Sequence, residues 1–279
     1  MQNRTCLIIV IVLAVAGLLL LCIGAAIAGA FAFLVPGRVG VSETTMTEIA
    51  ADTPATLEIR SQVGEITVVT GPEGLIQIEA EKKARARSSS RSEELRNAIQ
   101  VRVDRQNGTA RVVVDLPQTG PSENVSVDLH VRVPDRTSLD ISNNVGEVSV
   151  QGVAGDIRVR NAVGSVVLKD VDVTQEADVQ TDTGDVEFSG RLPESQGRVL
   201  LRSGVGGIQA RVPADSRFAL DAETNLGSIE SSFVVDEAQA GGGSGGQLGH
   251  WLRGSVKGGV GVELVLRSET GSISLQPIQ

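Results

Sequence analysis

A twelve-residue pattern of alternating apolar and polar positions recurs along the chain, and each copy contains a glycine. In Leu139–Val150 the pattern reads LDISNNVGEVSV, with alternation on both sides of a short polar turn. Alternation with period two is typical of β-strands that bury one face. Seven copies align on their glycines, which are Gly64, Gly146, Gly164, Gly184, Gly206, Gly227 and Gly271. We therefore expect each copy to form two strands that meet at a glycine corner.

The spacing of the glycines predicts how the copies are arranged. The gaps after Gly146 are 18, 20, 22, 21 and 44 residues, and the gap before it is 82 residues. A regular spacing near 20 favours an all-β parallel solenoid with one coil per copy. We expect the 44-residue gap to equal about two coils, with a Gly-rich loop at 236–255 that bulges outward.

The 82-residue gap interrupts the repeat. It predicts an N-terminal elaboration with a short helix at Arg91–Ala98, after the capping box Ser90-x-x-Glu93, and a β-hairpin around Asn107-Gly108.

Two positions of the pattern are uniform in every copy. Two residues after the glycine, all copies have Val or Ile, which predicts a core column: Ile66, Val148, Val166, Val186, Ile208, Ile229 and Ile273. Three residues before it, all have a small hydrogen-bonding residue: Ser61, Asn143, Asn161, Thr181, Ser203, Thr224 and Ser268. We expect these side chains to bond at the corner and the glycines to supply backbone freedom there. No histidine accompanies this polar row, so a structural role is favoured over a row of nucleophiles.

The N-terminal segment predicts a membrane anchor. Cys6–Val35 contains no charged residue, and at about 1.5 Å per residue it exceeds a hydrocarbon core of about 30 Å. A cleavable signal peptide ending near Ala26-Ile27-Ala28 is the alternative. Arg4 favours a cytoplasmic N-terminus, which makes the rest of this single-pass protein extracytoplasmic. The expected organisation is a tail at 1–5, an anchor at 6–35, a stalk at 36–54, an elaborated region at 55–138 and a repeat solenoid at 139–279.

Composition excludes several function classes. The formal net charge is -9, so we expect no nucleic-acid partner. Both cysteines, Cys6 and Cys22, lie in the predicted anchor, and the two histidines, His130 and His250, are far apart. We therefore expect no metal site, no cofactor and no catalytic residues. Among successive coils from Gly146 onward, no two neighbours both have an acid after the glycine, which disfavours a carboxylate-based polysaccharide lyase or hydrolase.

A few surface residues are candidates for interaction. Lys82, Lys83, Arg85 and Arg87 form a basic segment that could contact anionic wall polymers or lipid head groups, although acidic residues are interspersed. Trp251, beside the Gly-rich loop, is either an interaction tip or a cap over the last coil. The outward residues Asp140, Arg158 and Asp178 alternate in charge and predict an ion-pair ladder between coils.

The repeat Gly-[Glu/Asp/Ser]-[Ile/Val]-x-[Val/Leu], with Ser, Thr or Asn three residues before the glycine, resembles a bacterial family of "putative adhesin" repeat proteins. That family is related to the head-domain autotransporter adhesins. The resemblance covers roughly Leu57–Leu275 and implies a right-handed β-solenoid behind a membrane anchor. It also implies an adhesive or envelope-stress-associated role at the bacterial cell surface, with no catalytic residues.

We therefore expect a non-enzymatic, membrane-anchored adhesin or surface scaffold, whose partners are envelope proteins or cell-wall polymers. A sensory module that acts through membrane partners is the first alternative, and a β-helix lyase or hydrolase is the second. The oligomeric state stays open.

Overall fold

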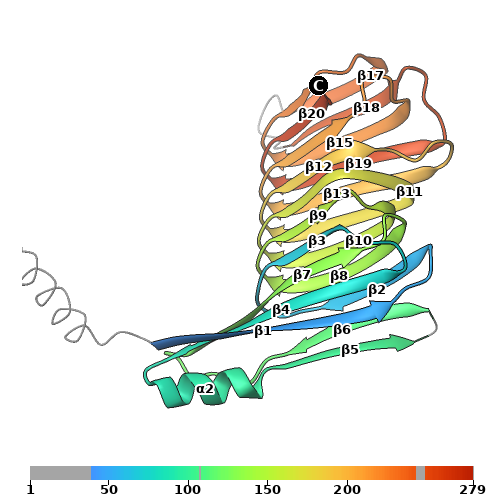
Figure 1. Ribbon diagram of the computed structural model, residues 1–279. Helices are drawn as coiled ribbons and strands as arrows, with labels where there is room; N and C mark the ends of the chain where they lie inside the picture. Colours follow the sequence, from blue (N-terminus) through green and yellow to red (C-terminus); the bar gives the residue numbers. More distant parts are fainter. Residues whose placement is uncertain (1–38, 107, 243–248, 279) are drawn as a thin grey trace, which may run out of the picture.

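The computed structural model describes residues 39–106, 108–242 and 249–278, which fold into stacked β-strands with one short helix (Figure 1). The all-β solenoid prediction is confirmed. The predicted anchor at residues 6–35 and the Gly-rich residues 243–246 lie outside the described residues. Within the described ranges, no helix is long and apolar enough to cross a membrane.

Two stacks of strands meet along the glycine corners. The first stack holds the strands before the glycines, in the spatial order β5 (Gln100–Gln106), β6 (Thr109–Asp115), β2 (Ala55–Arg60), β8 (Thr137–Val145), β10 (Ala154–Val163), β11 (Val166–Thr183), β13 (Gly197–Val205), β19 (Val262–Thr270), β15 (Phe218–Leu226), β18 (His250–Val256) and β17 (Val235–Gly242). The second holds the strands after them, in the order β1 (Val39–Ala50), β4 (Leu75–Ala86), β7 (Asn124–Val133), β3 (Ile66–Thr70), β9 (Val148–Gln151), β11, β12 (Val186–Arg191), β14 (Ile208–Val212), β20 (Ile273–Pro277) and β16 (Ile229–Ser231). Strand β11 belongs to both stacks because it ends one coil and begins the next.

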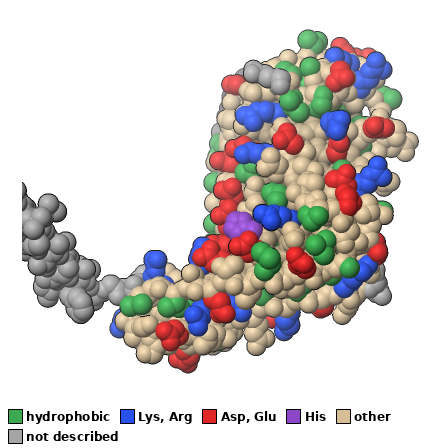
Figure 2. Space-filling model, in the orientation of Figure 1, with side chains coloured by type: hydrophobic (Ala, Val, Ile, Leu, Met, Phe, Trp, Pro, Cys, Tyr) green, Lys and Arg blue, Asp and Glu red, His purple; other side chains and the backbone are tan. Residues whose placement is uncertain are grey.

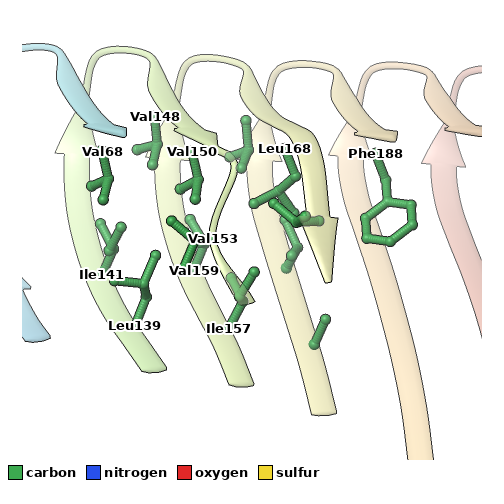
Figure 3. Close-up of a cluster of buried hydrophobic side chains, with 14 of the residues drawn as sticks. Val68, Leu139, Ile141, Val148, Val150, Val153, Ile157, Val159, Leu168 and Phe188 are labelled. Atoms are coloured by element: carbon green, nitrogen blue, oxygen red, sulfur yellow. The ribbon is translucent and has the colours of Figure 1, made fainter. Parts of the chain in front are cut away.

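The core lies between the two stacks and follows from the alternating pattern. In β8, Leu139 and Ile141 are buried, whereas Asp140 and Ser142 between them are partly exposed. The parallel register brings the residues two positions after each glycine into one column, and all except Ile229 are fully buried. Figure 3 shows Val, Ile and Leu side chains from neighbouring coils meeting in this space. Burying one such side chain contributes about 1.5–3 kcal/mol.

The first and last coils do not lie at the ends of the stacks. The β2–β3 coil, first in sequence, is inserted between β6–β7 and β8–β9. The β19–β20 coil, last in sequence, is inserted between β13–β14 and β15–β16. Its length predicted that the 44-residue gap would equal about two coils, and this prediction is wrong. The gap holds an antiparallel β17–β18 pair, which covers the last coil, and a return of the chain into the stack.

At one end of the second stack, strands β1, β4 and β7 form an antiparallel sheet that projects beyond the coils, with helix α2 (Ser89–Ala98) packed against one face (Figure 1). The apolar contact is small: Leu95 from the helix is buried with Ala84 and Ala86 from β4, and the partly buried Val41 and Val125 pack against them. Because residues 39–50 form β1, they are a paired strand and not the stalk expected at 36–54.

Two further local expectations differ from the structure. The helix cap is Ser88, whose side chain accepts a hydrogen bond from the Arg91 N–H, and not Ser90 of the predicted capping box. Most of the loop expected at 236–255 is strand, because β17 and β18 pair with each other.

The outer face of the first stack carries ion pairs, but their partners are not the ones that the charge alternation predicted. Asp140 accepts from Arg60 at 3.0 Å. Arg158 approaches Glu176 at 3.9 Å, and Arg160 approaches Asp178 at 4.0 Å. Exposed pairs of this kind contribute about 0–1 kcal/mol each, so they help to set the register more than they stabilise the fold.

Candidate functional site

Each glycine corner is tight because neighbouring coils touch there through their backbones. The corner glycines have φ between +130° and +155°, which residues with a side chain rarely adopt. A Cβ atom on Gly164 would lie 2.1 Å from the carbonyl oxygen of Gly146 in the adjacent coil. At all seven corners the corresponding distance is 1.9–2.2 Å. Glycine is therefore required at these corners for two reasons: the positive φ, and the lack of room for a Cβ atom between stacked coils.

The buried polar side chains three residues before the glycines bind these carbonyl oxygens. Asn161 Nδ2 donates to the oxygens of Gly146 and Gly164, both at 2.9 Å. Five others donate to the glycine of the adjacent coil at 2.8–3.1 Å: Asn143, Thr181, Ser203, Ser268 and Thr224. Ser61 Oγ is buried and has no hydrogen-bond partner within the part of the chain that the structure describes. Because these side chains are buried inside the corners, they belong to the architecture and not to an accessible binding site.

The residues directly before the corner glycines form a row that was not predicted from the sequence, and all of them are exposed except the half-buried Val63. This corner row consists, in stack order, of Val63, Val145, Val163, Thr183, Val205, Thr270 and Leu226. Four of its aliphatic side chains are 43%, 48%, 55% and 48% exposed, at Val145, Val163, Val205 and Leu226 respectively. The repeated Val, Thr or Leu at this position was visible in the sequence, but a period-two pattern does not say that a corner turns its apolar side chain outward.

Carboxylates flank the corner row. The segments from two residues before to one residue after each corner glycine contain five acids and no Lys or Arg; the acids, all exposed, are Glu65, Glu147, Asp182, Asp185 and Glu269. The register also places Asp128 beside Glu65, and Glu65 beside Glu147. Asp128 Oδ1 accepts from the Glu65 N–H at 3.0 Å, and Lys83 Nζ donates to Asp128 Oδ2 at 2.5 Å. The glycine-corner edge is thus both apolar and acidic.

A groove of about 810 Å³ lies beside the predicted basic segment, between the projecting sheet and the first glycine corner. It is lined by Ser42, Gln62, Val63, Lys83, Arg85, Pro117, Glu123 and Ser126, among others. Hydrogen bonds to Asp128 raise the pKa of Lys83 above its usual value. Hydrogen bonds from Arg91 lower the pKa of Glu123 to about 2. Lys83 and Arg91 are therefore neutralised by acidic neighbours, whereas Arg85 takes part in no ion pair among the residues that the structure describes.

The four basic residues predicted to act together do not lie on one surface. Lys83 and Arg85 line the groove, and Arg87 donates to Ser122 Oγ at 3.0 Å. Lys82 lies on the opposite face of β4 from its neighbour Lys83, because alternate strand residues point to opposite faces. Figure 2 shows basic and acidic side chains interspersed over this projecting end of the molecule. The segment is not a continuous basic patch.

Trp251 lies on β18, which pairs with β15 over the last coil, and it is partly buried. Its ring packs closely on Gly241 of the neighbouring strand, where a Cβ atom would lie 2.3 Å from the indole nitrogen. The Arg253 guanidinium lies 5.4 Å from the ring centroid, a cation–π distance. Of the two roles considered for Trp251, the geometry favours the cap.

The two histidines lie in separate parts of the molecule. His130 on β7 pairs in register with Thr67 on one side and Glu79 on the other, whereas His250 begins β18. In the ranges that the structure describes, no group of three or more His, Cys, Asp or Glu side chains is arranged to hold a metal ion.

The Toastrack DUF4097 family matches residues 55–204, which is more than half of the 279 residues. The chain belongs to this family. The matched region of the Toastrack protein begins at β2 and ends in β13, so the last inserted coil and its covering hairpin lie beyond it. No curated protein matches the chain.

Several solved structures show limited similarity to this Toastrack protein. A putative cell adhesion protein from Clostridium sporogenes ATCC 15579 is 14% identical, with a TM-score of 0.48 over 85% of this chain and 100% of the other. A putative adhesin from Bacteroides fragilis NCTC 9343 is also 14% identical, with a TM-score of 0.40 over 85% and 97%. A putative lipid binding protein from Parabacteroides distasonis ATCC 8503 is 10% identical, with a TM-score of 0.27 over the same shares. With scores below 0.5, these similarities carry no argument about function.

Proposed function

We propose that this Toastrack protein is a non-enzymatic interaction module that binds a protein partner of the cell envelope along its glycine-corner edge. The observation that supports this proposal is the corner row. Its side chains repeat on seven neighbouring coils, and at about 4.8 Å per coil the row is about 29 Å long. A row of that length on a rigid scaffold, with five aliphatic side chains and two threonines, is suited to a partner protein with an extended apolar surface.

The acidic residues beside the corner row indicate which kind of partner protein would bind there. The corner edge has carboxylates on both sides of the aliphatic row and no Lys or Arg in the turns themselves. A partner with basic residues around an apolar centre complements this edge, whereas an acidic wall polymer is repelled by it. Since the carboxylates are exposed, binding should weaken as salt concentration rises.

The location of the protein is part of the proposal. Residues 6–35 would anchor the chain in the membrane with the N-terminus in the cytoplasm, and the right-handed solenoid would lie outside. A surface adhesin and an envelope-stress sensor both need such a partner-binding edge, and they differ in whether the partner is on another cell or in the same membrane.

A triple substitution in the corner row tests the proposal. Val145→Ser, Val163→Ser and Val205→Ser remove three exposed aliphatic side chains without entering the core. The matched control is Val234→Ser with Val260→Ser, because these valines are 81% and 85% exposed and lie outside the row. Each full-length protein is cross-linked in intact cells, and its partners are compared by quantitative mass spectrometry.

We expect the triple variant to lose at least one envelope protein that the wild type and the control both retain. Recovery of the same partners by all three proteins would contradict the proposal. Cleavage of a polysaccharide panel by the purified full-length protein would overturn its non-enzymatic part.

A further inference from the structure

Among the strands that the structure describes, the two stacks end in four that have one neighbour each, and three of these edges are protected. Strand β5 carries Arg102, Asp104 and Arg105 within seven residues. Strand β16 has only three residues, and the register of β17 with β18 is irregular between Asp236 and Gln239. Charges, short strands and bulges are the means by which proteins block pairing at sheet edges.

Strand β1 is less protected. It has twelve residues in unbroken register with β4, contains no Lys, Arg or Pro, and carries two charged residues, Glu43 and Glu48. Most of its residues are exposed, and Met46 is 65% exposed. A long, regular and accessible edge of this kind is a template for an additional strand.

The backbone of β1 determines which groups that strand would meet. The Ala51 N–H donates to the Gly74 oxygen at 2.9 Å, in continuation of the β1–β4 register. In an antiparallel pair the hydrogen-bonded residues alternate, so the odd-numbered residues of β1 point their N–H and C=O groups toward β4. The even-numbered residues, from Gly40 to Glu48, point theirs away from β4 and toward solvent.

We propose that β1 of a second copy of this chain pairs antiparallel with β1, so that Thr44 faces Thr44 of the second copy. Two-fold symmetry about an axis perpendicular to the sheet keeps α2 of both copies on one face. It also brings the outward-pointing even-numbered residues of both strands together as hydrogen-bonded pairs. The dimer has one continuous sheet in which β1, β4 and β7 of both copies take part.

Charge complementarity selects this register and favours a second copy over an unrelated strand. With Thr44 facing Thr44, the register places Glu48 of one copy beside Gly40 of the other. At Gly40 the Arg85 side chain lies close, because a Cβ atom there would be 3.6 Å from Arg85 Nε. The ion pairs nearby are formed by Lys83, Arg91 and Arg96, and Arg85 is not among them in the part of the chain that the structure describes. Glu48 and Arg85 therefore form two symmetric ion pairs across the dimer.

The remaining cross-strand neighbours are compatible with this register. Glu43 faces Thr45, so no glutamate faces another glutamate, and like charges directly opposite each other would be destabilising. Val39 faces Ile49. The corner row is not part of this contact, so the dimer is independent of the partner proposed above.

The first test is Thr44→Pro in the full chain, with mass measured by sedimentation in nonionic detergent. Because the Thr44 N–H points away from β4, proline leaves the β1–β4 ladder intact and removes a central donor of the dimer. We expect a dimeric wild type, a monomeric Thr44→Pro protein with an unchanged unfolding midpoint, and a dimeric Thr44→Val control. A monomeric wild type overturns the proposal, as does a Thr44→Pro protein that remains dimeric through another surface.

The second test addresses the register and does not depend on proline. Arg85→Glu and Glu48→Arg should each raise the dimer Kd by about tenfold, because each disturbs both symmetric ion pairs. The double variant should restore dimerisation, since it reverses the charges of each pair. Equal weakening in the double variant would show that the two residues do not meet, and the proposed register would be wrong. The two proposals fail independently. The triple corner-row variant should lose its envelope partner and still form the dimer, whereas Thr44→Pro should lose the dimer and keep the corner row unchanged.

Discussion

The glycine corners allow a sharp test of why the repeat has the sequence that it has. Gly164→Ala changes two things: it introduces a Cβ atom at φ +130°, and it places that atom 2.1 Å from the Gly146 oxygen. Gly74→Ala is the matched control, since Gly74 has φ +73° and nothing within 4 Å of a Cβ atom. The control measures the penalty of a positive φ without a clash, so most of the difference between the two variants comes from the stacking clash at Gly164.

The magnitudes follow from the contacts. A Cβ atom costs about 1–2 kcal/mol at the left-handed φ of Gly74 and about 1–3 kcal/mol at the φ of +130° at Gly164, which residues with a side chain rarely adopt. Relieving the clash at Gly164 means moving neighbouring coils apart, which disturbs both 2.9 Å bonds from Asn161 and the 2.9 Å bond from the Gly146 N–H to the Val163 oxygen. Three such bonds at about 1 kcal/mol each bring the expected loss for Gly164→Ala to roughly 4 kcal/mol, against about 1 kcal/mol for Gly74→Ala.

Thermal unfolding of the full-length protein in detergent, followed by circular dichroism, measures the difference. A loss of roughly 4 kcal/mol should lower the midpoint by about 10 °C, whereas the control should fall by only about 2–4 °C. If both variants unfolded within a degree or two of each other, the coils would not be in backbone contact at Gly164, and the structural role of the corner glycines would be refuted.

Two further predictions concern the core and pH. Val186→Asp buries a charge in the core column, where Val186 is 0% exposed, and should destabilise the fold by several kcal/mol; Val205→Asp is the same change at a 55% exposed position and should leave the unfolding midpoint nearly unchanged. A well-folded Val186→Asp protein would contradict the column assignment. Glu123 has its pKa lowered from 4.5 to about 2 by hydrogen bonds from Arg91 and the Gly120 N–H, so its contribution is present above about pH 4.5 and is lost as the pH falls toward 2. The stability difference between wild type and Glu123→Gln should therefore shrink between pH 5 and pH 2 in denaturation curves, and a constant difference would show that this carboxylate is not held in the folded protein.

Local pattern was sufficient to predict the repeating unit. The β-branched column, the polar column and the glycines occupy fixed positions in each copy, and their roles depend mainly on neighbours in the same coil or at the same position of the next coil. Period-two alternation states which residues face inward, and a constant repeat length states that the coils stack. For this reason the all-β solenoid and its core could be derived from the sequence.

The order of the coils was decided only by tertiary structure. Nothing in Leu57–Val68 or Leu264–Leu275 says that these copies insert between other coils, because every copy presents similar edges and the choice depends on which pairing satisfies all edges together. Tertiary pairing likewise explains why a stalk was predicted where β1 lies. The residues of β1 have the polar composition of a stalk, and they form a strand because they pair with β4.

The candidate site shows the same division between sequence and structure. The identities of the residues before the corner glycines were readable in every copy, but their exposure depends on how tightly the corners turn. That turn leaves the glycine no room for a side chain, so it directs the preceding Val, Thr or Leu outward into a row. The sequence by itself determined the coil, its core and its corner chemistry. The three-dimensional packing of the coils decided which of those residues form an edge that a partner can reach.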